Sequence, residues 1–414
     1  MAIIKPFKGY RPIAEKAKAV ASRPYDVLNS EEAREEVKGN PDSFLYVVKP
    51  EIDLPPETDH YAMEVYEKGR DNFQALVDKG TFFQDDKDCL YIYRQEMNGR
   101  RQTGIMAAAA VSDYMNGIIK KHELTRPDKE EDRKNHVRVS RMNAEPVFFA
   151  YPAVPEIDRI IAGIEQEKPV YDFYADEGFG HTLWVVKDDA IIQQLVSLFD
   201  QKVPFTYVAD GHHRTAAAAL VGNELKQENP NHTGKEDYNY FLAVHFPDNQ
   251  LQIIDYNRVV KDIGNLTDEA FLKEIENRFD LEKIGPDIYK PNQLHNFGMY
   301  FEGEWYSLTA RPGTYDDNDP IGVLDVTILS EQILEPVLGI KDLRRDKRID
   351  FVGGIRGLEE LEKRVDTGEM KVAFALYPVT MQQLIDIADT GNIMPPKTTW
   401  FEPKLRSGLV VHRF

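Results

Sequence analysis

The stretch FTYVADGHHRTAAAA, residues 205–219, contains the transition on which the fold depends. Its first residues are mostly aromatic or β-branched, as in a buried strand. Its last residues are a run of alanine, the strongest helix former, so a helix is expected directly after the strand. The polar residues between them, Asp210-Gly211-His212-His213-Arg214, therefore lie in the turn from a strand into a helix N-terminus.

The residue types in this turn suit a bound anion. The first turn of a helix has backbone N–H groups without intrahelical partners and the positive end of the helix dipole. Gly211 lets an anion approach the backbone closely, and the guanidinium of Arg214 can clamp phosphate oxygens. His212 and His213 point in different directions, so they can divide phosphate contact and proton transfer between them. Asp210 has three open roles: a helix cap, a catalytic carboxylate or a Mg²⁺ ligand.

The overall composition limits the class of protein. With 414 residues the chain is long enough for two or three domains. Its net charge of −19, from 70 acidic and 51 basic residues, argues against a general nucleic-acid-binding protein. Cys89 is the single cysteine, and its apolar surroundings in the sequence favour a buried structural thiol. The first residues do not form a signal sequence and no apolar run is long enough to span a membrane, so we expect a cytoplasmic protein.

Hydrophobic patterns along the chain predict a mixture of helices and strands. Ser30 is expected to cap a helix, residues 44–48 to form a buried strand, and Asn98-Gly99 to connect strands at 90–95 and 104–111. Further helices are expected at residues 61–80, 127–143, 157–165, 190–199, 216–226, 268–279, 358–365 and 381–390, and further strands at 182–186, 205–209, 240–246 and 252–260. This order predicts a multi-domain α+β (mixed α/β) protein, with an N-terminal α+β region at 1–155, a phosphate-binding region at 156–265 and a C-terminal α+β region at 266–414.

Two segments reverse the negative charge of the chain. Residues 120–141 hold eight basic and five acidic residues, and residues 397–414 hold four basic and one acidic residue. In the first segment Thr125 can cap a helix that Pro127 opens, and His122-Glu123 adds acid and base groups just before it. A solvated helix face with internal ion pairs is the alternative for this segment. Because positive charge is local, a small phosphorylated ligand fits better than a nucleic acid, and we expect five cations to neutralise it: Arg126, Lys129, Arg133, Lys397 and Lys404.

Five segments together resemble a known family. They are Pro24-Tyr25-Asp26-Val27, Asn40-Pro41 with Ser43-Phe44, His122-Glu123 with residues 125–129 and Asp132-Arg133, residues 209–214, and residues 394–404 with Ser407-Gly408-Leu409. This set is similar to the bacterial and archaeal "domain of unknown function 1015" family, and the similarity runs from the first residues to the last. The Asp-Gly-His-His-Arg string also resembles the phosphate motif of the ParB/sulfiredoxin-like fold, which includes free L-serine kinases. The resemblance implies a ParB/sulfiredoxin-like core in which Gly211, His212, His213 and Arg214 bind phosphate.

These observations lead to a hypothesis about function. We expect a phosphotransferase that converts free L-serine to O-phosphoserine, or the reverse, with Mg²⁺ and with pyrophosphate or ATP/ADP as the donor. Asp26 or Glu123 would take the hydroxyl proton, and Tyr25, His122 and Thr125 would contact the substrate. We expect no nucleic acid and no membrane partner, and a homodimer is compatible with the sequence. Two alternatives stay open: a metal-dependent phosphohydrolase with ligands among His122, His181, His212 and His213, and a nucleotide-dependent regulatory module of ParB type.

Overall fold

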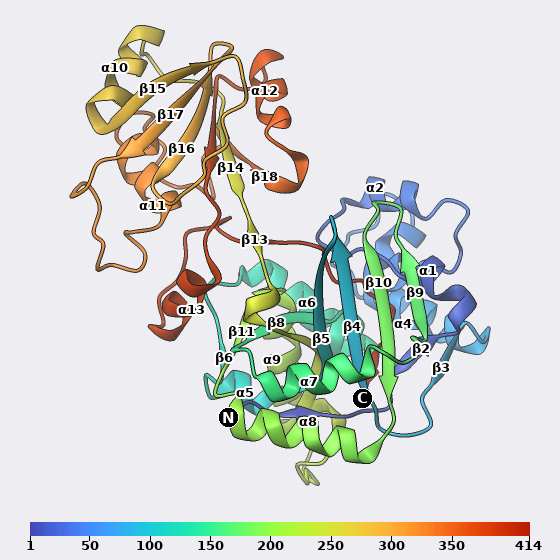
Figure 1. Ribbon diagram of the computed structural model, residues 1–414. Coiled ribbons are helices and arrows are strands. Elements are labelled where there is room, and N and C mark those ends of the chain that lie inside the picture. Colours follow the sequence, from blue (N-terminus) through green and yellow to red (C-terminus); the bar gives the residue numbers. More distant parts are fainter. The chain divides into compact units, whose positions relative to one another are not determined.

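The computed structural model describes residues 1–414 and shows a mixed α/β protein (Figure 1). Its contacts divide the chain into two compact units, Met1–Leu251 with Pro403–Phe414, and Gln252–Glu402. The sequence predicted three regions with boundaries near residues 155 and 265. The first boundary falls inside one sheet, because β8 (Val147–Tyr151) pairs with β11 (Thr206–Asp210) and β12 (Tyr240–Pro247). Pairing between strands this far apart in the chain has no local signature from which a boundary can be read.

The first unit is built around a nine-stranded mixed sheet. Its strand order is β6-β11-β8-β12-β5-β4-β10-β9, and β1 pairs with β5 beside this path. The pairs β6–β11 and β8–β12 are parallel, and the other pairs are antiparallel. The strands not yet located are β1 (Ile4–Lys5), β4 (Leu90–Met97), β5 (Arg100–Ala110), β6 (Ile119–Lys120), β9 (Tyr171–Tyr174) and β10 (Gly180–Val186). The predicted hairpin is confirmed, since Asn98 and Gly99 between β4 and β5 both have positive φ, at 52° and 77°.

Helices cover this sheet in two apolar clusters. The adjacent helices α7 (Pro155–Ile164) and α8 (Asp189–Lys202) pack on residues of β1, β4, β5 and β10 (Figure 1). The helix α9 (His212–Glu228) packs on β5, β8, β11 and β12 through alanines such as Ala218 and Ala219. Small side chains let α9 approach the strands closely, which brings its N-terminus to the end of β11.

Shorter elements complete the first unit around α9. The helix α6 (Pro127–Ser140) packs against α9 and against α4 (Met63–Asp78). The remaining helices are α1 (Ala17–Val20), α2 (Ser30–Glu36), α3 (Leu45–Val48) and α5 (Val111–Met115). Two small sheets, β2 (Tyr10–Pro12) with β3 (Phe82–Gln84) and β7 (Met142–Asn143) with β21 (His412–Arg413), tie down the chain ends. The C-terminal residues therefore belong to the first unit although the second unit precedes them in sequence.

The second unit contains a six-stranded antiparallel sheet of order β15-β17-β16-β19-β14-β18. These strands are β14 (Tyr256–Val260), β15 (Phe279–Gly285), β16 (Asn296–Phe301), β17 (Glu304–Ala310), β18 (Ile349–Gly353) and β19 (Val372–Leu376). The helices are α10 (Asp268–Arg278), α11 (Asp325–Leu329), α12 (Glu359–Asp366) and α13 (Met381–Asp389). A separate two-stranded sheet pairs β13 (Ile253–Ile254) with β20 (Trp400–Phe401).

Most predicted elements are present, and two are wrong in detail. Residues 44–48 were expected to form a buried strand, but Leu45–Val48 is a helical turn, because a short apolar run has no period that separates the two structures. The cap of α2 is Asn29, which forms a capping box with Glu32, and Ser30 is the first helical residue. Thr267 caps α10, because its side chain accepts the backbone N–H of Ala270. None of the helices is long and apolar enough to cross a membrane.

Candidate functional site

The predicted transition from strand to helix is present at residues 206–214. The strand β11 ends at Asp210 after an irregularity in its pairing with β8, and α9 begins at His212. Gly211 is the N-cap, with φ 91° and ψ 38° in the left-handed region, where a side chain is strained. The N-cap is Gly211 and not Asp210, so Asp210 does not have the capping role that the sequence left open. The backbone N–H groups of the first turn lack intrahelical partners and can bind an anion.

Arg214 folds back over the turn from which it projects. A Cβ on Gly211 would lie 3.0 Å from Nε of Arg214 and 3.1 Å from its Cζ, so any larger residue would force the guanidinium to shift. Nη1 donates to the carbonyl oxygen of Pro146 at 2.8 Å, and Nη2 lies 3.3 Å from Oδ2 of Asp210. Burial opposes the charge on Arg214, but nearby carboxylates outweigh it and raise its pKa. In this structure the buried guanidinium of Arg214 stabilises the turn through its contacts with Pro146 and Asp210.

Asp210 is held between two cations. Its Oδ2 lies 3.3 Å from Nη2 of Arg214 and 3.6 Å from Nζ of Lys404, which comes from the C-terminal segment of the same unit. Burial favours the protonated form, but Lys404 and Arg214 outweigh it and hold the pKa of Asp210 below its ordinary value. The carboxylate is thus ionised and already neutralised by two partners. Lys404 is the one predicted cation outside the turn whose ammonium reaches it.

The two histidines of the turn have different surroundings, as the sequence predicted. The ring of His212 is buried against that of His122, with centroids 4.5 Å apart and planes at 88°, and its Nδ1 lies 3.8 Å from Oε2 of Glu123. Nε2 of His213 accepts the backbone N–H of Arg126 at 3.0 Å. Burial lowers the pKa of all three imidazoles, that of His122 to about 4. Neutral His213, with Nε2 as the acceptor, carries its proton on Nδ1, which is then a donor.

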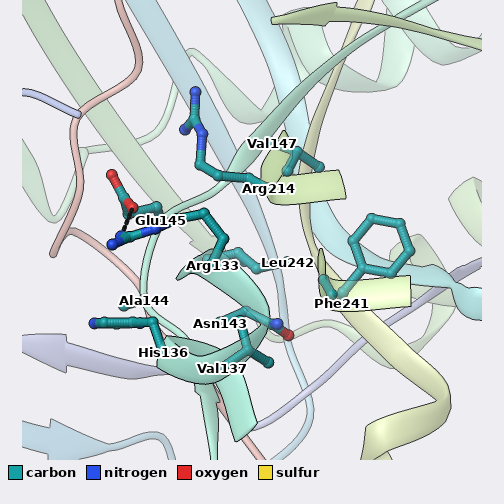
Figure 2. Close-up of a pocket in the computed structure, with 11 residues that line it drawn as sticks. Arg133, His136, Val137, Asn143, Ala144, Glu145, Val147, Arg214, Phe241 and Leu242 are labelled. Carbon is teal, nitrogen blue, oxygen red and sulfur yellow. Dashed lines mark ion pairs between the residues drawn. The ribbon is translucent and has the colours of Figure 1, made fainter. Parts of the chain in front are cut away.

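A buried polar cluster includes Arg133, Glu145 and Arg214 (Figure 2). Glu145 accepts the backbone N–H of Tyr25 at 2.9 Å and lies 3.8 Å from Nη1 of Arg133. The guanidinium of Arg133 stacks 4.0 Å from the ring of Tyr25. Arg133, Glu145 and Arg214 all line a cavity of about 30 Å³, enough for one or two water molecules. Asp26 follows Tyr25 and is exposed, and its charge acts on both Arg214 and His213.

Of the remaining predicted cations, only Arg126 acts on the turn, where its charge adds to burial in lowering the pKa of His213. Arg126 is exposed and pairs with Asp128, Lys129 contacts Tyr61, and Arg133 is buried against Asp132. These three residues recur at helical spacing, yet each side chain has a different partner. Thr125 donates to Glu130 and does not cap α6, whose N-cap is Arg126. Lys397 belongs to the second unit, where its ammonium lies 5.6 Å from the centre of the Tyr256 ring.

The sequence did not point to Glu145. It suggested a phosphate contact for Arg133, whose guanidinium is instead buried against Asp132 and Tyr25. Glu145 precedes Pro146 at the start of an apolar strand, and an acid at such a position was a usable signal. The sequence gives no sign of the two arginines that act on Glu145.

The histidines do not form a metal centre. His181 is bound elsewhere, with Nδ1 2.8 Å from the hydroxyl of Tyr93 and Nε2 accepting from Nε of Arg406 at 3.3 Å. No group of three or more His, Cys, Asp or Glu side chains is arranged to hold a metal ion. The histidine set of the phosphohydrolase alternative is therefore not assembled in this structure.

Comparison with known proteins gives one family match and several structural likenesses. A family model described as "Protein of unknown function (DUF1015)" matches residues 4–327. No curated protein matches the chain. A conserved hypothetical protein from Pyrococcus furiosus is 15% identical, with 75% of this chain and 95% of that chain covered and a TM-score of 0.33. A free serine kinase in complex with AMP is 13% identical, with coverages of 74% and 91% and a TM-score of 0.32.

A third solved structure, SbnI with a C-terminal truncation from Staphylococcus aureus, is 11% identical, with coverages of 74% and 87% and a TM-score of 0.33. Likenesses at these TM-scores carry no argument about activity, so a function has to be argued from the residues of the site.

Proposed function

We propose, from the premise that the chain belongs to the DUF1015 family, that it is a phosphotransferase whose phosphate-binding element is the turn at residues 210–214. The acceptor we propose is the hydroxyl of free L-serine, and the donor is pyrophosphate or an adenine nucleotide. The choice of serine rests on the resemblance of the turn to that of free L-serine kinases. The choice of phosphate chemistry rests on the geometry.

The observation that carries the proposal is the convergence of three distant segments on the N-terminal end of α9. The segment before α6 reaches it through Arg126, whose N–H meets Nε2 of His213 at 3.0 Å. The C-terminal segment reaches it through Lys404, 3.6 Å from Asp210. The Tyr25–Asp26 loop reaches it through the charge of Asp26 on His213 and Arg214. A helix N-terminus surrounded by a lysine, a neutral histidine donor and exposed carboxylates has the composition of a phosphoryl-transfer site.

The geometry supports phosphate binding by the backbone more than by Arg214. The N–H groups of the first turn of α9 would bind the phosphate oxygens, with Nδ1–H of His213 and the ammonium of Lys404 as further donors. Arg214 would hold the turn in its left-handed form through Asp210 and Pro146. Its charge is buried beneath the turn, where it adds to the positive potential of the helix end.

The proton of the serine hydroxyl needs an acceptor near the phosphate. The hydroxyl oxygen attacks the terminal phosphorus of the donor, the bond from phosphorus to the leaving phosphate oxygen breaks, and the proton passes to a carboxylate. The acceptor must also be open enough to reach a bound substrate. Two carboxylates near the turn are: Asp26 is exposed, and the side chain of Glu123 is 39% exposed. Asp210 is less suited, because its carboxylate is held by Lys404 and Arg214.

The residues present fit a Mg²⁺ ion that arrives with the donor phosphates. Mg²⁺ keeps several waters and usually binds one or two protein carboxylates together with substrate phosphates. Whichever of Asp26 and Glu123 is not the base would hold it, whereas Asp210 fits less well because two cations already neutralise its carboxylate. The ion would neutralise charge on the donor.

The experiment that tests this proposal is a product assay with purified protein. L-Serine and Mg²⁺ are mixed with ATP, ADP or pyrophosphate, and phosphoserine is measured by mass spectrometry, with the reverse reaction run in parallel. The variant Lys404→Met removes the ammonium beside Asp210, and we expect it to lower turnover at least tenfold. Lys18→Met is the matched control, because it removes an exposed ammonium that pairs with Asp176. Absence of phosphoserine with every donor would show that the proposed reaction is wrong.

A further inference from the structure

Glu145 is a carboxylate held in the interior of the first unit. It lies between β7 and β8, just before Pro146, and its side chain is 5% exposed. Burial raises its pKa, while Arg214, Arg133 and the N–H of Tyr25 oppose that rise. A buried carboxylate is costly to retain unless its contacts are used. The mechanism above does not use it.

The contacts of Glu145 connect four parts of the chain. Oε1 accepts the backbone N–H of Tyr25 at 2.9 Å and lies 3.5 Å from Oγ of Ser407 in the C-terminal segment. Oε2 lies 3.8 Å from Nη1 of Arg133 on α6. The charge of Arg214 on α9 also acts on it, and both residues line the same cavity (Figure 2). These segments are the ones that carry the parts of the proposed site.

Charge balance shows that Glu145 is more than the counter-ion of Arg133. Arg133 already has Asp132, whose Oδ2 accepts from Nε at 3.1 Å and from Nη2 at 2.9 Å. Glu145 accepts the amide N–H of Tyr25, the residue before Asp26, at 2.9 Å. This distance is shorter than those to Arg133 and Ser407. The Glu145 side chain therefore ties the Tyr25–Asp26 loop to the start of β8.

We propose that Glu145 is a positioning residue, which anchors the Tyr25 amide so that the carboxylate of Asp26 faces His213 and the phosphate-binding turn. This inference rests on the proposed function of the turn. It predicts that the length of the side chain matters, because one methylene fewer withdraws the oxygen by about 1.5 Å from the Tyr25 amide. Charge balance alone would predict the opposite dependence.

Two substitutions separate reach from charge. Glu145→Asp keeps the charge and shortens the reach, while Glu145→Gln keeps the reach and one acceptor oxygen but removes the charge. The readout is the pKa of His213, measured by NMR on histidine-labelled protein. Burial and Arg126 lower this pKa, and three carboxylates raise it: Asp26, Asp128 and Glu130. Moving Asp26 away should therefore lower the pKa of His213. We expect Glu145→Asp to lower the His213 pKa to the value found in Asp26→Asn, and Glu145→Gln to leave it unchanged.

Turnover provides the second readout. We expect Glu145→Asp to lower kcat by on the order of 100-fold, the effect of misplacing a catalytic group by about 1 Å, with a smaller change in KM for serine. The double variant with Asp26→Asn should be no worse than Asp26→Asn alone. Asp113→Asn is the matched control: Asp113 is also a buried carboxyl with a raised pKa that accepts one backbone N–H, from Ile3, and its change should not move His213.

The outcomes separate this inference from the proposed function. If Glu145→Gln lowers the His213 pKa and Glu145→Asp does not, Glu145 only balances charge and the inference is overturned. Unchanged His213 titration in both variants overturns it equally. The titration needs no enzymatic turnover, so it decides the role of Glu145 even if no phosphoserine is formed.

Discussion

The substitution Gly211→Ala tests the geometry of the turn with a known perturbation. The backbone at Gly211 has φ 91°, and a left-handed conformation costs an alanine about 1–2 kcal/mol. The new methyl group would also lie 3.0 Å from Nε and 3.1 Å from Nη2 of Arg214, so the guanidinium must move. That movement breaks the 3.3 Å contact to Asp210, and a hydrogen bond between charged groups contributes about 1.5–3 kcal/mol. We therefore expect a loss of roughly 2.5–5 kcal/mol in the free energy of unfolding.

Gly178→Ala is the matched control for this variant. Gly178 has φ 85°, and nothing lies within 4 Å of the position of its Cβ, so this change introduces only the backbone strain. Denaturant unfolding measures the stability of both variants, and calorimetric titration measures their affinity for pyrophosphate. We expect Gly178→Ala to bind like the unchanged protein and Gly211→Ala to bind at least tenfold more weakly, a loss of about 1.4 kcal/mol. Equal stability losses together with equal affinities would refute the role assigned to the glycine.

Three further predictions concern single side chains of the first unit. Asp26→Asn and Glu123→Gln should differ in phosphoserine formation, because only one of the two carboxylates is the base. The variant that lacks the base should lose about 10²–10⁴-fold in kcat. Equal small losses would show that neither carboxylate is the base. Cys89 should react slowly with Ellman's reagent at pH 8 in the native state, because burial raises its pKa to about 11, and rapid labelling would contradict its buried position. Burial lowers the pKa of His122 from 6.5 to about 4, so the free energy of unfolding should fall as the pH falls from about 6.5 towards 4. In denaturant titrations, His122→Gln should remove up to about 3 kcal/mol of this fall.

The local parts of the fold were accessible from the sequence. The alanine run after Gly211 and the Asn98-Gly99 turn are signals of a few residues, and the structure has α9 and the β4–β5 hairpin where they predict them. The apolar run at 44–48 failed because length and period do not separate a buried strand from a buried helical turn. The grouping into units failed because β8, β11 and β12 come from distant parts of the chain.

The candidate site was predictable in its residue types and less so in its contacts. The turn itself, Lys404 and the approach of residues 122–126 to the histidines follow from clustering of charge in the sequence. Arg133 shows the limit of such reasoning: its spacing from Arg126 and Lys129 is helical, yet its guanidinium is buried on Tyr25. Tertiary partners such as Glu145 decide which cations face a ligand. No local sequence pattern predicts these partners.

The most direct measurement is a crystal structure of the protein soaked with pyrophosphate and Mg²⁺. The account predicts a phosphate group on the backbone N–H groups at the start of α9, within hydrogen-bonding distance of Nδ1 of His213 and of Lys404, with Asp26 facing it. A phosphate bound elsewhere, with the first turn of α9 left to solvent, would contradict the assignment of residues 210–214 as the phosphate-binding element.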